Sequence, residues 1–167
     1  FSSWNGIISK MPSWGNGYNL QAGLTQNIAC GIGTYVKTDW TPQTGTWYHA
    51  MCVYDGSNMT LYVNGVKEAS TNYDIKTGNT DFKIGMFYTD NSIFFDGFIN
   101  NIRIYNRDIS GEEVKDLYQG KHIQDGLVGY WPLTNMEGCE VTDLSGSENH
   151  GTLQPNCPDN SPEWKNK

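Results

Sequence analysis

The segment Leu61-Tyr62-Val63-Asn64-Gly65-Val66-Lys67 decides the fold, because it places a turn signal between two runs of strand-forming residues. Asn-Gly supplies the two positive-φ positions of a type I′ turn, whose twist matches that of an antiparallel hairpin. We therefore predict strands over 59–63 and 66–70 in a fixed register. A second turn signal, Tyr54-Asp55-Gly56-Ser57-Asn58, lies upstream, so residues 47–70 are expected to form a three-stranded meander.

Short β-rich runs separated by turn residues continue on both sides of this meander. Such spacing is typical of a sandwich or barrel rather than of alternating strands and helices. The 167 residues include 19 Gly and 13% aromatic side chains, a composition that suits an all-β domain. The further strands that we expect lie at 6–10, 18–23, 27–35, 46–54, 82–87, 94–105 and 126–133.

One short helix is predicted after the strand at 94–105. Ser110-Gly111-Glu112-Glu113 has the pattern of a capping box, in which the Ser hydroxyl and the Glu carboxylate satisfy backbone N–H groups reciprocally. Val114, Leu117 and Tyr118 then form one apolar stripe, and Gly120 is expected to end the helix. The predicted fold class is all-β, an antiparallel two-sheet sandwich with one short helix.

The charge balance limits the possible partners. The chain carries 18 acidic and 11 basic residues, a net charge of -7. Attraction to phosphates or anionic lipids is therefore unfavourable, and we expect neither nucleic acid nor a bare membrane surface as a partner. No apolar run is long enough to insert into a bilayer, and Phe1 begins with neither an initiator Met nor a signal peptide. We predict a soluble chain that is a mature piece or a fragment.

The four cysteines show no Cys-x-x-Cys spacing, which argues against a zinc ribbon or a dithiol redox centre. Disulfides are the favoured use, with three connectivities open and four buried thiols as the alternative. We favour Cys139 with Cys157, which would close an irregular segment, and Cys30 with Cys52 across neighbouring strands. The triplet Asn58-Met59-Thr60 adds an expected N-glycosylation acceptor at Asn58, which fits a secretory route.

A series of short motifs follows in order from about residue 6 to about residue 120. They are Ile7-Ile8-Ser9-Lys10, Gly17-Tyr18-Asn19-Leu20, Gly45-Thr46-Trp47-Tyr48-His49-Ala50, Val53-Tyr54-Asp55-Gly56, Leu61-Tyr62-Val63-Asn64-Gly65, Phe82-Lys83-Ile84-Gly85, Phe95-Asp96-Gly97-Phe98-Ile99 and Arg103-Ile104-Tyr105-Asn106-Arg107. In order and spacing the series resembles the laminin G-like domains of the concanavalin A-like lectin and glucanase superfamily. The resemblance implies that the sandwich is jelly-roll-like.

The tail resembles a different part of the same family pattern. The segment 126–133, followed by Thr142-Asp143-Leu144-Ser145-Gly146 and Asn149-His150-Gly151-Thr152-Leu153, is similar to the opening of such a domain. We therefore divide the chain into residues 1–120, a sandwich without its opening strands, and residues 121–167, which would pack on that sandwich or on a neighbouring copy.

A sandwich that lacks a strand exposes unpaired backbone groups along one edge. The resemblance implies that the opening strand pairs with the late strand, here 94–105. We expect 126–133 to return to that strand within the same chain, and the alternative is exchange with other copies. Alternation along the late strand puts Asn100 on the same face as Ile102 and Ile104, so Asn100 is expected to be buried.

Catalytic and zinc sites are not expected. Glucan hydrolases of the superfamily need carboxylates spaced as Glu-x-Asp-x-x-Glu along a strand, and this chain has no such triplet. No nucleophile elbow surrounds any serine, and His49, His122 and His150 lack a partner at ligand spacing. We therefore predict that the protein is not an enzyme.

Calcium is the predicted cofactor, because the ion takes oxygen ligands on turns and the resembled domains often bind it at the rim of the sandwich. The alternative is that these residues simply form turns. The two candidate groups are Asp143, Ser145 and Asn149 in the tail, and Asp90, Asn91 and Asp96 before the late strand.

Glycan recognition needs exposed aromatic side chains near polar groups. Trp14, Tyr35, Trp40 and Tyr88 fall in or beside predicted loops, with core packing as the alternative. We expect a non-catalytic recognition or adhesion module of an extracellular or cell-surface protein, binding a glycan or an extracellular protein. The alternatives are a subunit of an extracellular filament or array, and an accessory domain of a carbohydrate-active enzyme.

Overall fold

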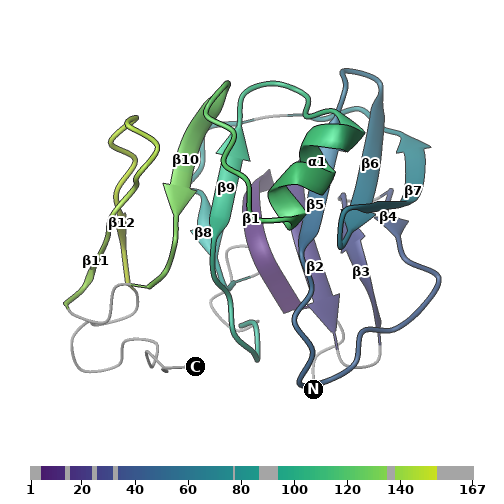
Figure 1. Ribbon diagram of the computed structural model, residues 1–167, viewed down its shortest axis with the longest axis horizontal. Coiled ribbons are helices and arrows are strands. Elements are labelled where there is room, and N and C mark those ends of the chain that lie inside the picture. Colours follow the sequence, from purple (N-terminus) through teal and green to yellow (C-terminus); the bar gives the residue numbers. More distant parts are fainter. Residues whose placement is uncertain are drawn as a thin grey trace. The chain divides into compact units, whose positions relative to one another are not determined.

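The fold is described from a computed structural model. The described residues are 5–13, 16–23, 26–31, 34–76, 78–86, 94–134 and 138–153. Twelve strands and one helix lie in these residues, and the strand pairs are antiparallel (Figure 1). The predicted all-β class is confirmed. The chain divides into two compact units, unit 1 with Phe1–Gly97 and Asp108–His122, and unit 2 with Phe98–Arg107 and Ile123–Lys167.

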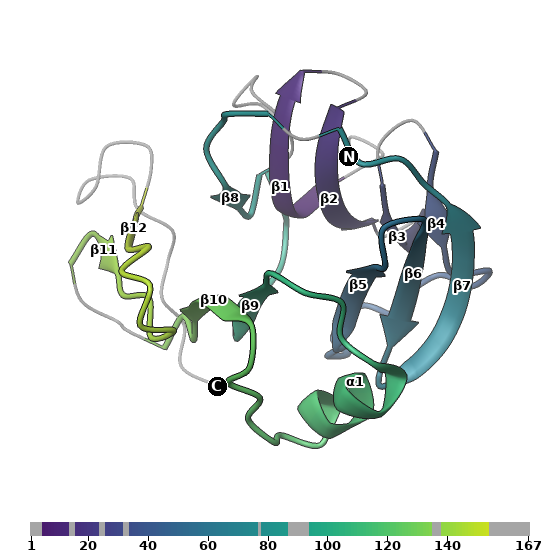
Figure 2. The same ribbon diagram turned by 90° about the horizontal axis from the view of Figure 1, so that it is seen from above.

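Unit 1 contains two antiparallel sheets that face each other (Figure 2). One sheet has five strands in the order β4-β3-β2-β1-β8, and the other has three in the order β5-β6-β7. The strands are β1 (Asn5–Ser13), β2 (Asn16–Gly23), β3 (Gln26–Cys30), β4 (Val36–Lys37), β5 (Ala50–Tyr54), β6 (Asn58–Val63), β7 (Val66–Asn72) and β8 (Lys83–Ile84).

The core of unit 1 is built from both sheets. Leu20 and Cys30 of the five-stranded sheet and Met59, Leu61 and Val63 of β6 are buried in one cluster. The β6 side chains alternate between buried and half-buried positions, the period of two of a strand with one face on a core. The two sheets therefore form a sandwich.

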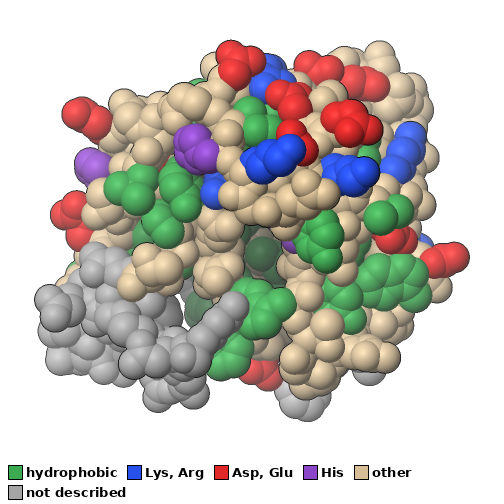
Figure 3. Space-filling model, in the orientation of Figure 1, with side chains coloured by type: hydrophobic (Ala, Val, Ile, Leu, Met, Phe, Trp, Pro, Cys, Tyr) green, Lys and Arg blue, Asp and Glu red, His purple; other side chains and the backbone are tan. Residues whose placement is uncertain are grey.

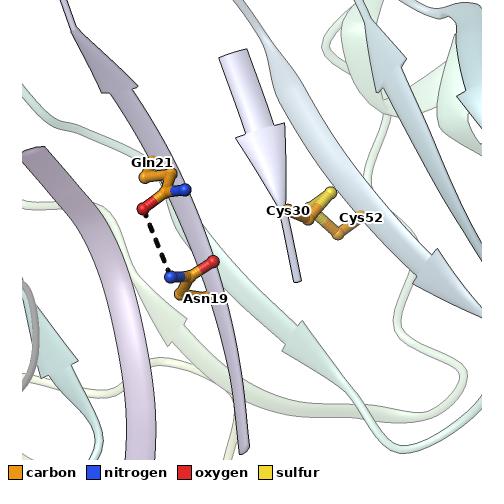
Figure 4. The surroundings of a disulfide bond; sticks show 4 residues. All are labelled: Asn19, Gln21, Cys30 and Cys52. Atoms are coloured by element: carbon orange, nitrogen blue, oxygen red, sulfur yellow. Dashed lines mark hydrogen bonds between the residues drawn. A yellow bond between two sulfur atoms is a disulfide. The ribbon is translucent and has the colours of Figure 1, made fainter. Parts of the chain in front are cut away.

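A disulfide between Cys30 of β3 and Cys52 of β5 connects the two sheets across this core (Figure 4). Their Cα atoms lie 6.3 Å apart. The predicted pairing is confirmed, but the two strands belong to opposite sheets and are not neighbours in one sheet. Cys139 is also disulfide-bonded, and its predicted partner, Cys157, lies outside the described residues.

The meander forms as predicted. Asn64 and Gly65 have φ values of 51° and 78°, and Val63 pairs with Val66 on either side of the turn. The preceding turn is closed by Asp55, whose Oδ1 accepts hydrogen bonds from the backbone N–H groups of Ser57 and Asn58 at 2.9 and 2.7 Å. Strand β5 begins at Ala50 rather than at residue 46.

Two other predicted strands are shorter in the structure. The expected strand 27–35 ends at Cys30 and is followed by β4, which the sequence analysis missed. Gly31 explains the break, because its φ is 102° and a Cβ there would lie 2.4 Å from the carbonyl oxygen of Thr34. The expected strand 82–87 is reduced to β8.

Helix α1 (Gly111–Tyr118) has the predicted capping box, with Ser110 Oγ accepting from the N–H of Glu113 and Glu113 Oε2 accepting from the N–H of Ser110. Val114 and Leu117 are buried, and Gly120 follows the helix with a φ of 84°. Tyr118 was predicted in the same apolar stripe but is exposed, because it lies in the last turn of a short helix.

Unit 2 contains the pair β9 (Ile102–Tyr105) and β10 (Leu127–Trp131) and the short pair β11 (Glu140–Val141) and β12 (Gly151–Thr152). Strand β10 pairs with β9 from Leu127–Tyr105 to Trp131–Ile102. The predicted return of 126–133 to the late strand of its own chain is therefore present. The late segment 98–107 lies in this unit, although the sequence analysis assigned it to residues 1–120.

The late strand itself is shorter than predicted. Of the expected residues 94–105, only 102–105 form a named strand, and Asn100 is exposed rather than buried. Asn101 has a φ of 60°, which interrupts the extended backbone just before β9 and ends the alternation on which the prediction depended.

Replacement of both Cys30 and Cys52 by alanine is expected to lower the free energy of unfolding by about 3 kcal/mol, because the bond closes a loop with a sequence separation of 22 residues and joins the two sheets. Urea unfolding followed by tryptophan fluorescence measures the change. The double variant is preferred to a reducing agent because it leaves the disulfide of Cys139 intact. Unchanged stability would contradict the proposed cross-linking role.

Two variants of Asn64 separate its backbone role from its side-chain role. Asn64→Gly keeps the positive φ and loses the side-chain hydrogen bond, so we expect a loss of about 1 kcal/mol. Asn64→Ala also strains the turn, and we expect a loss of roughly 2–3 kcal/mol. Thermal unfolding of both variants is the measurement. Equal losses would show that the left-handed conformation does not matter here.

Candidate functional site

The four aromatic residues predicted as a glycan platform have different surroundings. Trp40 is half-buried and packs against the core of unit 1, with its indole N–H donating to Glu68 Oε2 at 2.8 Å and its ring 5.6 Å from that of Tyr48. Tyr35 is half-buried. Trp14 and Tyr88 lie outside the described residues. A ligand-binding role for these four stays a prediction, and the contacts of Trp40 are those of a packed side chain.

Two aromatic residues that the sequence analysis did not select are exposed on unit 1. Trp47, in the segment leading into β5, is 45% exposed, and Tyr118, at the end of α1, is 49% exposed. His49 follows Trp47 by two residues and lies beside the ring of Tyr118, and the exposed Val66 follows Gly65, which Tyr118 approaches. We call Trp47, His49, Val66 and Tyr118 the aromatic surface. Trp47 was missed because it fell in a predicted strand, and Tyr118 because it matched a helical stripe.

Asn64 anchors the backbone of His49 through two hydrogen bonds. The N–H of His49 donates to Asn64 Oδ1 at 2.9 Å, and the N–H of Asn64 donates to the carbonyl of His49 at 2.8 Å. This reciprocal pair fixes the entry of β5 to the β6–β7 turn. The ring of His49 in turn lies 6.0 Å from the ring of Tyr118, centre to centre.

Gly65 lets α1 approach the same turn. A Cβ at Gly65 would lie 3.2 Å from Tyr118 Cδ1 and 3.3 Å from Lys115 Cα, closer than nine in ten real Cβ contacts. Both views show α1 beside the ends of β5 and β6 (Figures 1 and 2). Glycine is therefore needed at this position for its positive φ and for the close approach of the helix.

Charges of both signs surround the aromatic surface. Helix α1 carries Glu112 and Glu113 in its first turn and Lys115 near its end. Asp116 forms an ion pair with Lys121, with an N–O distance of 2.8 Å. Figure 3 shows acidic and basic side chains intermixed over the position of α1. No single sign of charge dominates, so the surface does not favour a strongly ionic ligand.

The tail group predicted to bind calcium does come together in unit 2, around the carboxylate of Asp143. Oδ1 accepts from the N–H groups of Tyr130 and Ser145 at 2.7 and 2.9 Å, and Oδ2 accepts from Ser145 Oγ and the N–H of Asn149 at 2.8 and 3.0 Å. Both carboxylate oxygens, which a metal would use, are thus directed at protein donors.

The same turn, residues 143–149, also occupies the edge of β10 that faces away from β9. Asn149 Nδ2 donates to the carbonyl of Val128 at 2.8 Å, and the N–H of Leu144 donates to the carbonyl of Tyr130 at 2.8 Å. The indole N–H of Trp131 donates to the carbonyl of Asn149 at 2.9 Å. The turn therefore satisfies backbone groups that an added strand would otherwise pair with.

The carboxylate of Asp143 is stabilised in its charged form. Burial raises the pKa of Asp143, but the hydrogen bonds from Tyr130, Ser145 and Asn149 lower it by more than burial raises it. The pKa of Asp143 therefore lies below its ordinary value. Asp143 is buried, so these donors replace water around the charge. At neutral pH the residue acts as an ionised acceptor inside the turn.

The second predicted calcium group has one member, Asp96, among the described residues. Asp96 is exposed, while Asp90 and Asn91 lie outside the described residues. Within the described part of the chain, no cluster of three or more His, Cys, Asp or Glu side chains is placed to hold a metal ion. Calcium binding stays a prediction.

The predicted glycosylation acceptor, Asn58, is half-buried at the start of β6. Its Nδ2 lies 3.4 Å from Asp55 Oδ2, and hydrogen bonds from the backbone of Asn58 and Ser57 lower the pKa of Asp55. Modification of Asn58 stays a prediction. In the described residues, no helix has the length and apolarity to cross a membrane.

Replacement of Asp143 by asparagine is expected to lower the free energy of unfolding at pH 7 by roughly 2 kcal/mol, because two of its four donors would face an amide N–H₂ group. The folded pKa of Asp143 is below the unfolded value of about 3.9, so its contribution is present above that pH and disappears as the pH falls through the folded pKa. The stability difference between the proteins should therefore shrink below about pH 4. Urea unfolding at several pH values measures it, and a pH-independent difference would contradict this role.

The chain matches a known protein family and resembles solved structures. A family model described as the concanavalin A-like lectin/glucanases superfamily matches residues 1–115. No curated protein sequence matches the chain. A solved structure described as a "putative carbohydrate binding protein" from Bacteroides ovatus ATCC 8483 aligns with a TM-score of 0.75 and 22% identity, covering 91% of this chain. The chain spans 48% of the length of that protein.

A second solved structure is an S-layer domain-containing protein, residues 221–444, from Clostridium thermocellum ATCC 27405. It aligns with a TM-score of 0.40 and 21% identity, over 69% of this chain and 63% of that one, and no inference is taken from it. The first alignment supports the sandwich fold. Because the family model covers well over half of its residues, the chain belongs to the laminin G-like family of the concanavalin A-like lectin/glucanases superfamily.

Proposed function

We propose that this protein is a non-catalytic module that binds a neutral glycan through the aromatic surface of unit 1. The observation that carries the proposal is the exposure of two aromatic side chains, Trp47 and Tyr118, of which Tyr118 packs against Gly65 and the ring of His49. Flat aromatic rings bind the apolar C–H faces of sugar rings, while polar groups beside them bind hydroxyls. His49 and Lys115 provide such polar groups next to Tyr118.

The mixed charges around α1 favour a neutral ligand over an acidic one. Lys115 is balanced by Glu112 and Glu113 in the same helix, and the protein as a whole carries a net charge of -7. A polyanionic glycan would meet repulsion at long range. A neutral saccharide depends on stacking and hydrogen bonding, which this surface offers.

The family supports carbohydrate recognition, since its description names lectins, and one similar structure carries the description "putative carbohydrate binding protein". Catalysis is not part of the proposal. The disulfides at Cys30–Cys52 and at Cys139 support a secreted or cell-surface location, where such bonds persist.

The filament alternative depends on an open strand edge. Strand β10 pairs with β9 of its own chain, and the turn of residues 143–149 occupies its other edge. These contacts favour pairing of residues 126–133 within their own chain, so assembly by exchange of that strand is not the function that we propose.

Binding to a glycan array, with and without calcium, tests the proposal, and the best ligand is then titrated by calorimetry. Trp47→Ala and Tyr118→Ala are each expected to weaken binding about tenfold, the loss that corresponds to one aromatic contact. Phe94→Ala is the matched control, because Phe94 is an exposed aromatic residue that pairs with Met86 beyond β8. The control should bind like the unaltered protein.

The outcomes separate the parts of the proposal. An array without any bound glycan under either calcium condition would overturn glycan recognition. Binding that persists in both Trp47→Ala and Tyr118→Ala would overturn the assignment of the surface. Binding that requires calcium would support the predicted cofactor.

A further inference from the structure

Strand β2 carries two amide side chains that are removed from water. Asn19 is 2% exposed and Gln21 is 0% exposed. The residue between them, Leu20, belongs to the apolar core, so alternation places both amides on the opposite face of the five-stranded sheet. Figure 4 shows the two amides on the side of β2 away from the Cys30–Cys52 disulfide.

The two amides form one hydrogen bond with each other, which leaves one acceptor and one donor without a partner among the described residues. Asn19 Nδ2 donates to Gln21 Oε1 at 3.4 Å, a long hydrogen bond. Asn19 Oδ1 and Gln21 Nε2 are buried and have no hydrogen-bond partner among the described residues. If both amides were turned over, the pair would still leave one donor and one acceptor unpaired. Buried polar groups in native proteins nearly always have a hydrogen-bond partner, so Asn19 Oδ1 and Gln21 Nε2 each need one.

Serine completes the polar surroundings. Ser9 pairs directly with Asn19 across β1 and β2, which brings their side chains together, and Ser9 is itself 2% exposed. Its Oγ donates to the carbonyl of Met86 at 2.9 Å, which leaves the hydroxyl lone pairs able to accept.

The strand partners of Gln21 are small. Gly6 of β1 and Ala29 of β3 pair with Gln21 from either side. Neither has a long side chain that would fill the space beside the amide or reach its unpaired atom. Strand pairing therefore places Gln21 Nε2, which needs a hydrogen-bond partner, beside two residues with little side-chain volume.

We propose that one ordered water molecule is bound at this position, bridging Gln21, Asn19 and Ser9. Water would accept from Gln21 Nε2 and donate to Asn19 Oδ1 and to Ser9 Oγ. Three hydrogen bonds are the usual number for a buried water. The set contains neutral groups alone, with a donor beside an acceptor, and so matches neither a cation, which needs several oxygen ligands, nor an anion, which needs several donors.

A high-resolution crystal structure of the unaltered protein is the direct test. The expected result is ordered density within 3.2 Å of Asn19 Oδ1 and Gln21 Nε2, about the upper distance of a hydrogen bond. An unoccupied position, or amides that bond other protein groups instead, overturns the proposal.

Magnetic relaxation dispersion of water oxygen in solution gives an independent readout, because it counts long-lived internal waters. The double variant Asn19→Leu with Gln21→Leu should lose the signal of one such water. The matched control Asn72→Leu alters an exposed amide of β7 and should lose none. If the double variant does not fold, Gln21→Met alone serves, with the same expected loss. An unchanged dispersion in a folded variant also overturns the proposal.

Discussion

The left-handed turn at Asn64 and Gly65 is the constraint on which unit 1 depends. It fixes the register of β6 against β7, and a slip of one residue would turn the buried face of β6 outward. The same two residues also build the surface: the Asn64 side chain holds the entry of β5 through His49, and the missing Cβ of Gly65 admits Tyr118. One local conformation thus contributes both to the register of the sheet and to the position of Tyr118.

In unit 2, the turn of residues 143–149 satisfies backbone groups on the edge of β10 that does not pair with β9. Residues 143–149 have the composition of a calcium-binding turn, yet Asp143 Oδ1 and Asn149 Nδ2 bond to the backbone of β10, while Asp143 Oδ2 accepts from donors within the turn. A carboxylate that accepts four hydrogen bonds is well suited to this task, because it gathers several backbone donors at one point. The residue types alone therefore do not distinguish a metal ligand from an edge cap.

Local signals in the sequence predicted local structure well. The Asn-Gly turn, the capping box at Ser110 and the alternation of β6 depend on residues a few positions apart, and all three are present. The late strand was predicted too long, because the positive φ of Asn101 has no signal in the apolar pattern. The exposure of Trp47 and Tyr118 also could not be predicted, because it depends on which sheet and helix meet in three dimensions.

The rigidity of the aromatic surface matters for recognition as much as its composition. A side chain that must be ordered on binding costs affinity, whereas one already held by its neighbours does not. The backbone of His49 is fixed by two hydrogen bonds to Asn64, and the Tyr118 side chain lies against Gly65 and the ring of His49. Their positions depend on the turn and the capped helix rather than on a long loop. A saccharide that binds as proposed would therefore meet Tyr118 and the segment of His49 already in position.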